Sequence, residues 1–435
     1  MKRSAPGFQK RKWVLFLTCL LLSFQTACDS DVLNDQKIEL LPISDTEAIL
    51  SNGRLSLKLK ASGALQSIRF IPVVTEPNRL ISVGNTLGMW ISGFQNGIRA
   101  NVMANSPSAI DKFSLRNPDS EKSGLFVVNR GDFLAGFENW QDVLGAPTNS
   151  DGSPKMNGDV MAWGALTSTP TTGNPGNSFS GLDIVVNPYL FEDDDLKSTL
   201  FIRFHISNES SIPVENLHLG FGGDVDLFWS DPANPPCGRL NAGWNQTGYN
   251  LDKNYSFTFV KPEPNDGDLP SNCFGTMVGY SIVGSSSAHG MQAPILAHTV
   301  LTRTPEAPFQ AFNETEIQTP SQVMFFLQGL SSAGTPMINP SSGEATAFAY
   351  TGNPITNTGW VDTRKDVRSL QSISPITLAP GEKIETIVAI FTVSSPTFEQ
   401  GYEDLSTLYD KVMSLRSTWD NGWQIYGERM LTYRK

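Results

Sequence analysis

The stretch GGDVDLFWSDP holds the residues whose types and spacing best suit metal chemistry, with Asp224, Asp226 and Asp231 placed around an aromatic pair. Calcium takes roughly six to eight oxygen ligands, which carboxylates together with nearby amide and backbone oxygens can supply. Asp at a strand end also forms ordinary turns through side-chain to backbone hydrogen bonds. The stretch therefore predicts either a calcium site or a polar turn, and catalysis by these carboxylates is a third hypothesis.

Other catalytic patterns are missing from the sequence. Its histidines, His205, His218, His289 and His298, occur without an HExxH spacing, and neither a GxSxG elbow nor a phosphate-binding GxxxxGK[ST] loop is present. His289 lies in a polar loop, whereas the other three lie in or beside apparent strands. This favours a non-catalytic protein.

Aromatic residues suggest a different role, the binding of sugars. Trp229, Trp244 and Trp360 lie in or beside segments rich in Gly, Asn and Asp, which is typical of loops and strand ends. Such rings either stack on a ligand or anchor a loop against the core. The opening segment SNGRLSLKLKASGALQSI is also similar to first strands of large sugar-acting β-sandwich domains. A carbohydrate-active enzyme, using two carboxyl groups across a cleft, or a glycan-binding component of a polysaccharide-degrading system is therefore the alternative hypothesis.

The N-terminus predicts export. MKRSAPGFQKRK contains five basic residues and no acidic one, and the apolar run that follows is too short for a comfortable membrane-spanning helix. The segment ends in FQTACDSD, where Cys28 follows a small residue as in the lipobox of bacterial lipoproteins. The resemblance implies that Cys28 is lipidated and becomes the mature N-terminus, with several acyl chains giving stable attachment. An ordinary secretory cleavage site is the alternative.

Removal of residues 1–27 leaves 27 basic residues against 43 acidic ones, a net charge of −16. An acidic surface repels phosphate backbones, so nucleic acid is not expected as a partner. Cys237 and Cys273 then remain in the exported part. In an oxidising compartment they predict one disulfide, and two unpaired thiols are the alternative. Zinc is not expected, because no CxxC spacing or paired His accompanies them.

Alternating hydrophobicity predicts a mainly β fold. In the segment 55–60, leucines alternate with Ser and Lys, which is typical of a half-buried strand, and Gly63 marks the following turn. Similar segments occur at 199–207, 216–227, 255–260, 295–301, 323–330 and 384–393, separated by runs rich in Gly, Pro, Ser and Asn. This pattern predicts a large antiparallel β-sandwich, either one sandwich or two abutting ones.

The C-terminal segment differs, because its apolar residues recur at helical spacing. Leu405, Leu408, Val412, Leu415 and Trp419 fall on one helical face. We expect a single amphipathic helix that packs on the sheet, and a partner-binding helix is the alternative. The predicted organisation is a signal peptide at 1–27, a polar tether at 28–45, a sandwich ectodomain at 46–395, and a C-terminal helix and tail at 396–435.

The segment 351–393 resembles the C-terminal part of a family of large, mostly uncharacterised exported β-sandwich proteins of environmental bacteria. The family pattern reads G-D-P-x-T-x-T-G-W-x-D, then D-x-R, then S-x-G-P-x-x-L-x-P-G-[DE]. The matching residues are Gly352, Pro354, Thr356, Thr358, Gly359, Trp360, Asp362, Asp366, Arg368, Ser372, Pro375, Leu378, Pro380, Gly381 and Glu382. The departures are Asn353 for the Asp and Ser374 for the second Gly. Further blocks along the mature chain agree in order.

Taken together, the sequence predicts a lipoprotein anchored in the cell envelope and facing the periplasm or the cell exterior. Its membrane contact would be the N-terminal lipid, and its other partner a glycan or an envelope protein. Calcium is the one cofactor that the composition suggests. The ectodomain is expected to act in surface binding or envelope structure.

Overall fold

The computed structural model describes residues 47–71, 80–104, 110–117, 124–130, 146, 148–150, 153–169, 178–225, 227–230, 245–261, 275–287, 295–302, 317, 319–363, 367–373 and 375–415. The predicted signal peptide, the tether and residues 416–435 lie outside these ranges. So do Cys28, Cys237, Cys273, Asp226, Asp231, Trp244, His289 and Trp419.

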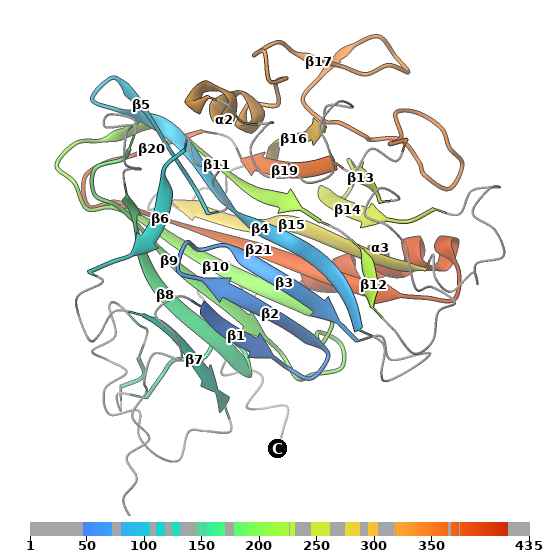
Figure 1. Ribbon diagram of the computed structural model, residues 1–435, viewed down its shortest axis with the longest axis horizontal. Coiled ribbons are helices and arrows are strands. Elements are labelled where there is room, and N and C mark those ends of the chain that lie inside the picture. The colour runs from blue at the N-terminus through green and yellow to red at the C-terminus, as the bar shows by residue number, and fades with distance from the viewer. Residues whose placement is uncertain are drawn as a thin grey trace, which may run out of the picture. The chain divides into compact units, whose positions relative to one another are not determined.

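In the described part of the chain, nineteen strands form two layers that face each other (Figure 1). The first layer contains β1 (Glu47–Ser51), β2 (Leu55–Lys60), β3 (Leu65–Phe70), β4 (Leu80–Gln95), β5 (Ile98–Met103), β11 (Val214–Asp224), β12 (Phe228–Ser230), β16 (Ile295–Thr302), β19 (Val367–Ile373) and β20 (Ile376–Leu378). The second contains β6 (Lys112–Leu115), β7 (Leu125–Asn129), β8 (Val160–Thr169), β9 (Leu182–Leu190), β10 (Thr199–Asn208), β13 (Gln246–Asn250), β14 (Tyr255–Phe259), β15 (Thr276–Ser287) and β21 (Lys383–Ser394).

Strand pairing confirms the predicted antiparallel sandwich. Among the described strands, only the short contact between β5 and β6 is parallel, and it links the two layers. In the first layer, β4 pairs with β3, β5, β11 and β12 along its length. In the second layer, β10 lies between β9 and β21, and β21 also pairs with β15. The described residues, from Glu47 to Leu415, belong to one compact unit, which favours one sandwich over two abutting ones.

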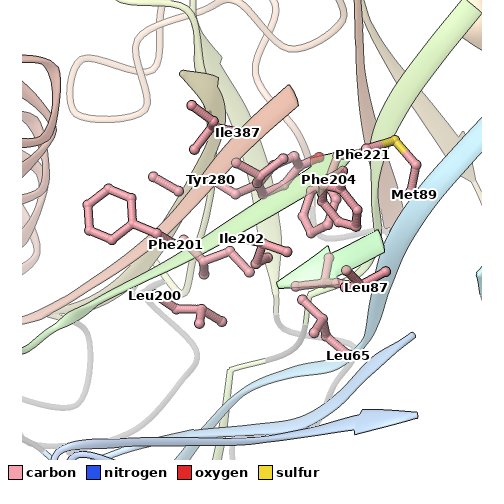
Figure 2. Packing of buried hydrophobic residues seen from close by; sticks show 14 of the residues in the cluster. Leu65, Leu87, Met89, Leu200, Phe201, Ile202, Phe204, Phe221, Tyr280 and Ile387 are labelled. Atoms are coloured by element: carbon pink, nitrogen blue, oxygen red, sulfur yellow. The ribbon is translucent and has the colours of Figure 1, made fainter. Parts of the chain in front are cut away.

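The core lies between the two layers, as the alternation of β2 predicts. Leu55, Leu57 and Leu59 are fully buried, and the turn after this strand contains Gly63 with a φ of 75°. That backbone conformation suits glycine because it has no Cβ. Figure 2 shows Leu65 and Leu87 of the first layer near Ile202 and Phe204 of the second.

Aromatic and polar contacts also join the layers. The ring of Phe221 on β11 lies 6.1 Å from that of Phe204 and 5.9 Å from that of Tyr280. The Tyr280 hydroxyl donates to Ser369 Oγ at 2.8 Å, which ties β15 to β19. Packing and hydrogen bonding together therefore fix the register of one layer on the other.

The predicted C-terminal helix is present as α3 (Phe398–Ser414), which packs on the outer face of the second layer (Figure 1). Leu405 and Val412 are fully buried, and Leu408 is half-buried. The Tyr409 ring lies 4.8 Å from Tyr255 and 5.6 Å from Phe391. Its apolar stripe is therefore part of the core of this chain.

The prediction of a strand at 323–330 is wrong, because this segment contributes to a second helix, α2 (Pro320–Leu327). The residues before the apolar run explain the difference. Pro320 is at a favoured first helical position, and the Gln322 side chain accepts from the Thr319 backbone N–H at 3.1 Å. Gly329, with a φ of 76°, follows the last turn. A small hairpin of β17 (Met337–Ile338) and β18 (Ala345–Thr346) comes next.

Neither α2 nor α3 has the length and apolar composition needed to cross a bilayer, and these are the helices of the described part of the chain.

Candidate functional site

The predicted calcium ligands are only partly within the described structure. Asp224 is half-buried at the end of β11, opposite Thr86 on β4. Asp226 and Asp231 lie outside the described residues. Within the described ranges, no group of three or more His, Cys, Asp and Glu side chains could hold a metal ion. The calcium site at Asp224, Asp226 and Asp231 stays a prediction.

Of the three tryptophans named for ligand stacking, Trp360 has a described side chain. Its ring packs edge-on against Tyr350, with centroids 5.4 Å apart. The loop that holds it is closed by the Gly352 N–H, which donates to the Trp360 carbonyl at 2.8 Å. The ring contact and the backbone hydrogen bond together anchor the loop. The backbone of Trp229 pairs with Ile81 in β12, and Trp244 lies outside the described residues.

His298 is a buried structural residue. Its Nδ1 lies 2.9 Å from the Ala349 carbonyl, and its ring stacks on Tyr249 with centroids 4.7 Å apart. Burial lowers the pKa of His298 to about 4. A neutral imidazole at this position joins β16 to the loop that follows β18.

A polar group of a different kind lies on the outer face of the second layer. Ile202, Phe204 and Ile206 of β10 point into the core, so strand alternation directs Arg203 and His205 outward. Glu385 lies directly opposite His205 on β21. We call Arg203, His205 and Glu385 the open-face triad.

The triad is organised around one carboxylate oxygen. Arg203 Nη2 donates to Glu385 Oε2 at 2.6 Å, and His205 Nδ1 lies 3.4 Å from the same oxygen. The side chains keep 14%, 16% and 30% of their surface exposed for Arg203, Glu385 and His205. The carboxylate is thus held firmly, while the imidazole is half-buried and partly reaches solvent.

Asn187 supports this face from the neighbouring strand. It pairs with Arg203 across β9 and β10 and is fully buried. Its amide nitrogen donates to the Ala162 carbonyl at 2.6 Å, and its oxygen accepts from Asn157 Nδ2 at 2.5 Å. Rigid support of this kind fixes side chains for binding without a further loss of conformational entropy.

The surroundings shift both titrating members of the triad. Burial, Arg203 and Lys383 lower the pKa of His205 to about 3, so its ring is neutral at pH 7. Burial raises the pKa of Glu385, while its hydrogen bond from Arg203 acts in the opposite direction. Perturbed ionisable groups that also reach solvent are typical of functional sites.

The triad can exchange hydrogen bonds with hydroxyl groups. The Glu385 carboxylate accepts hydrogen bonds and the Arg203 guanidinium donates them. A neutral His205 donates from one ring nitrogen and accepts at the other. With its Nδ1–H assigned toward Glu385, Nε2 is left as an acceptor.

Sequence reasoning placed His205 in a strand but missed the triad. The available signal was alternation, since Arg203 and His205 interrupt the apolar run TLFIRFHIS at every second residue. Glu385 lies 180 residues further along the chain, and only strand pairing brings it to His205.

Comparisons with known proteins give little further guidance. No protein-family model and no curated protein matches the chain. Among solved structures, a protein assigned provisionally as an aldose 1-epimerase from Escherichia coli K12 aligns over 80% of this chain and 99% of its own, with 10% identity and a TM-score of 0.28. Values this low carry no argument about fold or activity.

Proposed function

We propose that this protein is an exported, lipid-anchored protein of the cell envelope whose β-sandwich binds a glycan without transforming it. The observation that carries the glycan part is the open-face triad, in which rigid and partly exposed groups offer donors and acceptors together. Sugars present closely spaced hydroxyl groups of both kinds, and buried polar groups matched to hydroxyls discriminate strongly against ligands that lack them.

The anchoring part of the proposal depends on the N-terminal sequence. A basic segment, a short apolar run and Cys28 at the expected exit point support lipidation and placement in the envelope. Membership of the exported family that the segment 351–393 resembles belongs to the same proposal. Mass spectrometry of the processed N-terminus would detect acylated Cys28, and an unmodified chain would contradict anchoring.

A glycan array with the processed protein, followed by calorimetric titration of the best ligand, tests binding. We expect Glu385→Gln to raise the dissociation constant at least about tenfold, because it removes the carboxylate charge that organises Arg203 and His205. Glu47→Gln is the matched control. Glu47 also pairs with basic side chains, Lys58 and Lys60, but it is on β1 in the other layer.

Two results would contradict this proposal. One is the absence of any glycan ligand on the array, and the other is binding that Glu385→Gln and Glu47→Gln affect equally.

The second candidate function is a carbohydrate-active enzyme. Glu385 favours it, because burial raises the pKa of its carboxyl group and a carboxyl group with a raised pKa is a candidate general acid or base. Incubation with polysaccharides and assay of released reducing ends distinguishes the two functions. Product that disappears in both His205→Gln and Glu385→Gln would establish catalysis in place of simple binding.

A further inference from the structure

The outer face of the first layer is covered by α2, which is fastened at both ends (Figure 1). At its C-terminal end, Thr299 Oγ1 donates to the Phe326 carbonyl and Ser372 Oγ to the Leu327 carbonyl, each at 2.7 Å. These carbonyls belong to the last helical turn, which has no further partner within the helix. At the N-terminal end, Arg99 of β5 donates to Ser321.

The surface beneath α2 is apolar at one end and polar at the other. The apolar end consists of Trp90, Met103, Ile110, Ile317, Val323, Phe326, Leu327 and Leu370. Two residues along the strands, register places Asn101, Ser92 and His218 side by side on β5, β4 and β11. Gly220, two residues from His218, faces Leu327, so alternation puts His218 on the α2 side. We call Asn101, Ser92 and His218 the covered row.

The covered row is fully enclosed, and its hydrogen bonding within the described chain is incomplete. Each of the three residues has 2% or less of its surface exposed. Ser92 Oγ donates to Asn101 Oδ1 at 2.5 Å. Asn101 Nδ2 and both ring nitrogens of His218 have no hydrogen-bond partner in the described part of the protein.

Three such atoms, on the two strands that flank β4, are costly. A buried donor or acceptor without a partner destabilises a fold by about 1–3 kcal/mol, and native proteins satisfy most of them with protein or ordered solvent. An isolated orphan atom would be a local irregularity. Several unsatisfied polar atoms in one row, with complementary donor and acceptor groups, indicate that they share a binding partner.

The chemistry of the row defines that partner. The Asn101 amide has two hydrogens to donate, and a neutral His218 has one donor and one acceptor nitrogen. Ser92 Oγ donates its hydrogen to Asn101, and it can still accept a hydrogen bond. No charged group is among the three, so an ion is disfavoured, and the complement is a neutral group that both donates and accepts.

We propose that the covered row is an internal binding site for a hydroxyl-bearing molecule, with α2 as its cover. Water is the smallest occupant with this chemistry, because it makes two to four hydrogen bonds in buried polar sites. A polyol hydroxyl has the same chemistry and would enter when the Arg99–Ser321 end of α2 opens. The site is on the opposite outer face from the open-face triad, so it does not depend on the proposed glycan function.

A high-resolution crystal structure of the processed protein gives the direct test. We expect an oxygen within hydrogen-bond distance of Asn101 Nδ2 and of a His218 ring nitrogen. Thermal melting gives the second readout, with Asn101→Leu as the reference because that substitution by itself removes the acceptor of Ser92 Oγ. If an oxygen is bound to His218, adding His218→Phe to Asn101→Leu lowers the melting temperature further, by at least about 2 °C. If nothing is bound, the double variant melts at the same temperature as Asn101→Leu or higher, because unsatisfied polar atoms have been removed.

Glycerol distinguishes the two sources of the hydroxyl. A rise in melting temperature with glycerol that is larger in the wild type than in the double variant identifies a polyol site, whereas equal rises identify water. Both outcomes support the proposal. The lack of density at the row, together with a double variant that melts no lower than Asn101→Leu, would overturn it. Should the double variant fail to fold, density in the wild type decides the question alone.

Discussion

The two outer faces of the sandwich carry histidines in comparable positions but in opposite environments. His218 on β11 and His205 on β10 both point away from the core. His218 is covered by α2 and 2% exposed, whereas the His205 side chain is 30% exposed beside a carboxylate. The covering helix therefore determines whether a polar row on a sheet becomes an internal site or a surface available to large ligands.

The two helices also hold their faces differently. α3 packs through aromatic rings, including Tyr409 against Phe391. In α2, strand hydroxyls bind the carbonyls of the last turn, next to an apolar cluster. Apolar packing tolerates small shifts, whereas hydrogen bonds fix position and direction. Packing therefore keeps α3 on its face, whereas directional hydrogen bonds hold α2 in a defined position on the other face.

The largest effect is expected on the α3 face. Leu405→Ala removes a fully buried side chain between α3 and the sheet and should lower the free energy of unfolding by about 2–5 kcal/mol. Chemical denaturation measures the change. Thr407→Ala, at an exposed position of the same helix, is the control. Equal effects of the two substitutions would mean that α3 does not stabilise this face by packing.

Acid should destabilise the fold through the histidines of both outer faces. Burial lowers the pKa of His218 to about 4 in the folded state, against an ordinary value near 6.5. The folded chain therefore binds fewer protons than the unfolded chain. Its stabilisation is complete above about pH 6.5 and is lost as the pH falls toward 4, by up to about 3 kcal/mol.

Urea unfolding between pH 7.5 and 4 measures this loss. We expect His218→Gln to unfold with a shallower dependence on pH than the wild type. His205→Gln should also unfold with a shallower dependence on pH, because the pKa of His205 is lowered to about 3 in the folded state. Identical slopes for His218→Gln and the wild type would contradict the assigned environment.

The smallest effect compares two ion pairs. Glu385→Gln removes the carboxylate charge beside the half-buried Arg203 and should cost about 1–2 kcal/mol. Glu47→Gln breaks a solvent-exposed pair and should cause no measurable change in the unfolding free energy. Denaturation at low and high salt checks both, since salt screens the exposed pair more strongly. A larger loss for Glu47→Gln would reverse the comparison.

Local sequence patterns predicted much of the fold, and the main error of the prediction also concerned a local segment. Alternation predicted β2 and β10, and helical spacing predicted α3. The run VMFFLQGL was ambiguous, because a short apolar segment has no period that separates a strand from a buried helix. The cap formed by Thr319 and Gln322 was the signal that would have identified α2.

The functional groups were less predictable than the strands that carry them. Asp224 and its neighbours were predicted as metal ligands because carboxylates close in sequence suggest a metal site. The open-face triad combines residues of β10 and β21, and the covered row combines residues of β4, β5 and β11. Neither has a local pattern, because lateral neighbours in a sheet are far apart along the chain.

By itself, the sequence determined which residues face the core, since side-chain alternation depends only on backbone geometry within a strand. It also determined the amphipathic face of α3, and its N-terminal segment predicts export. Tertiary structure alone decided that His205 meets Glu385 and that α2 encloses His218. Strand order and helix docking depend on the packing of the whole chain, which no short segment encodes.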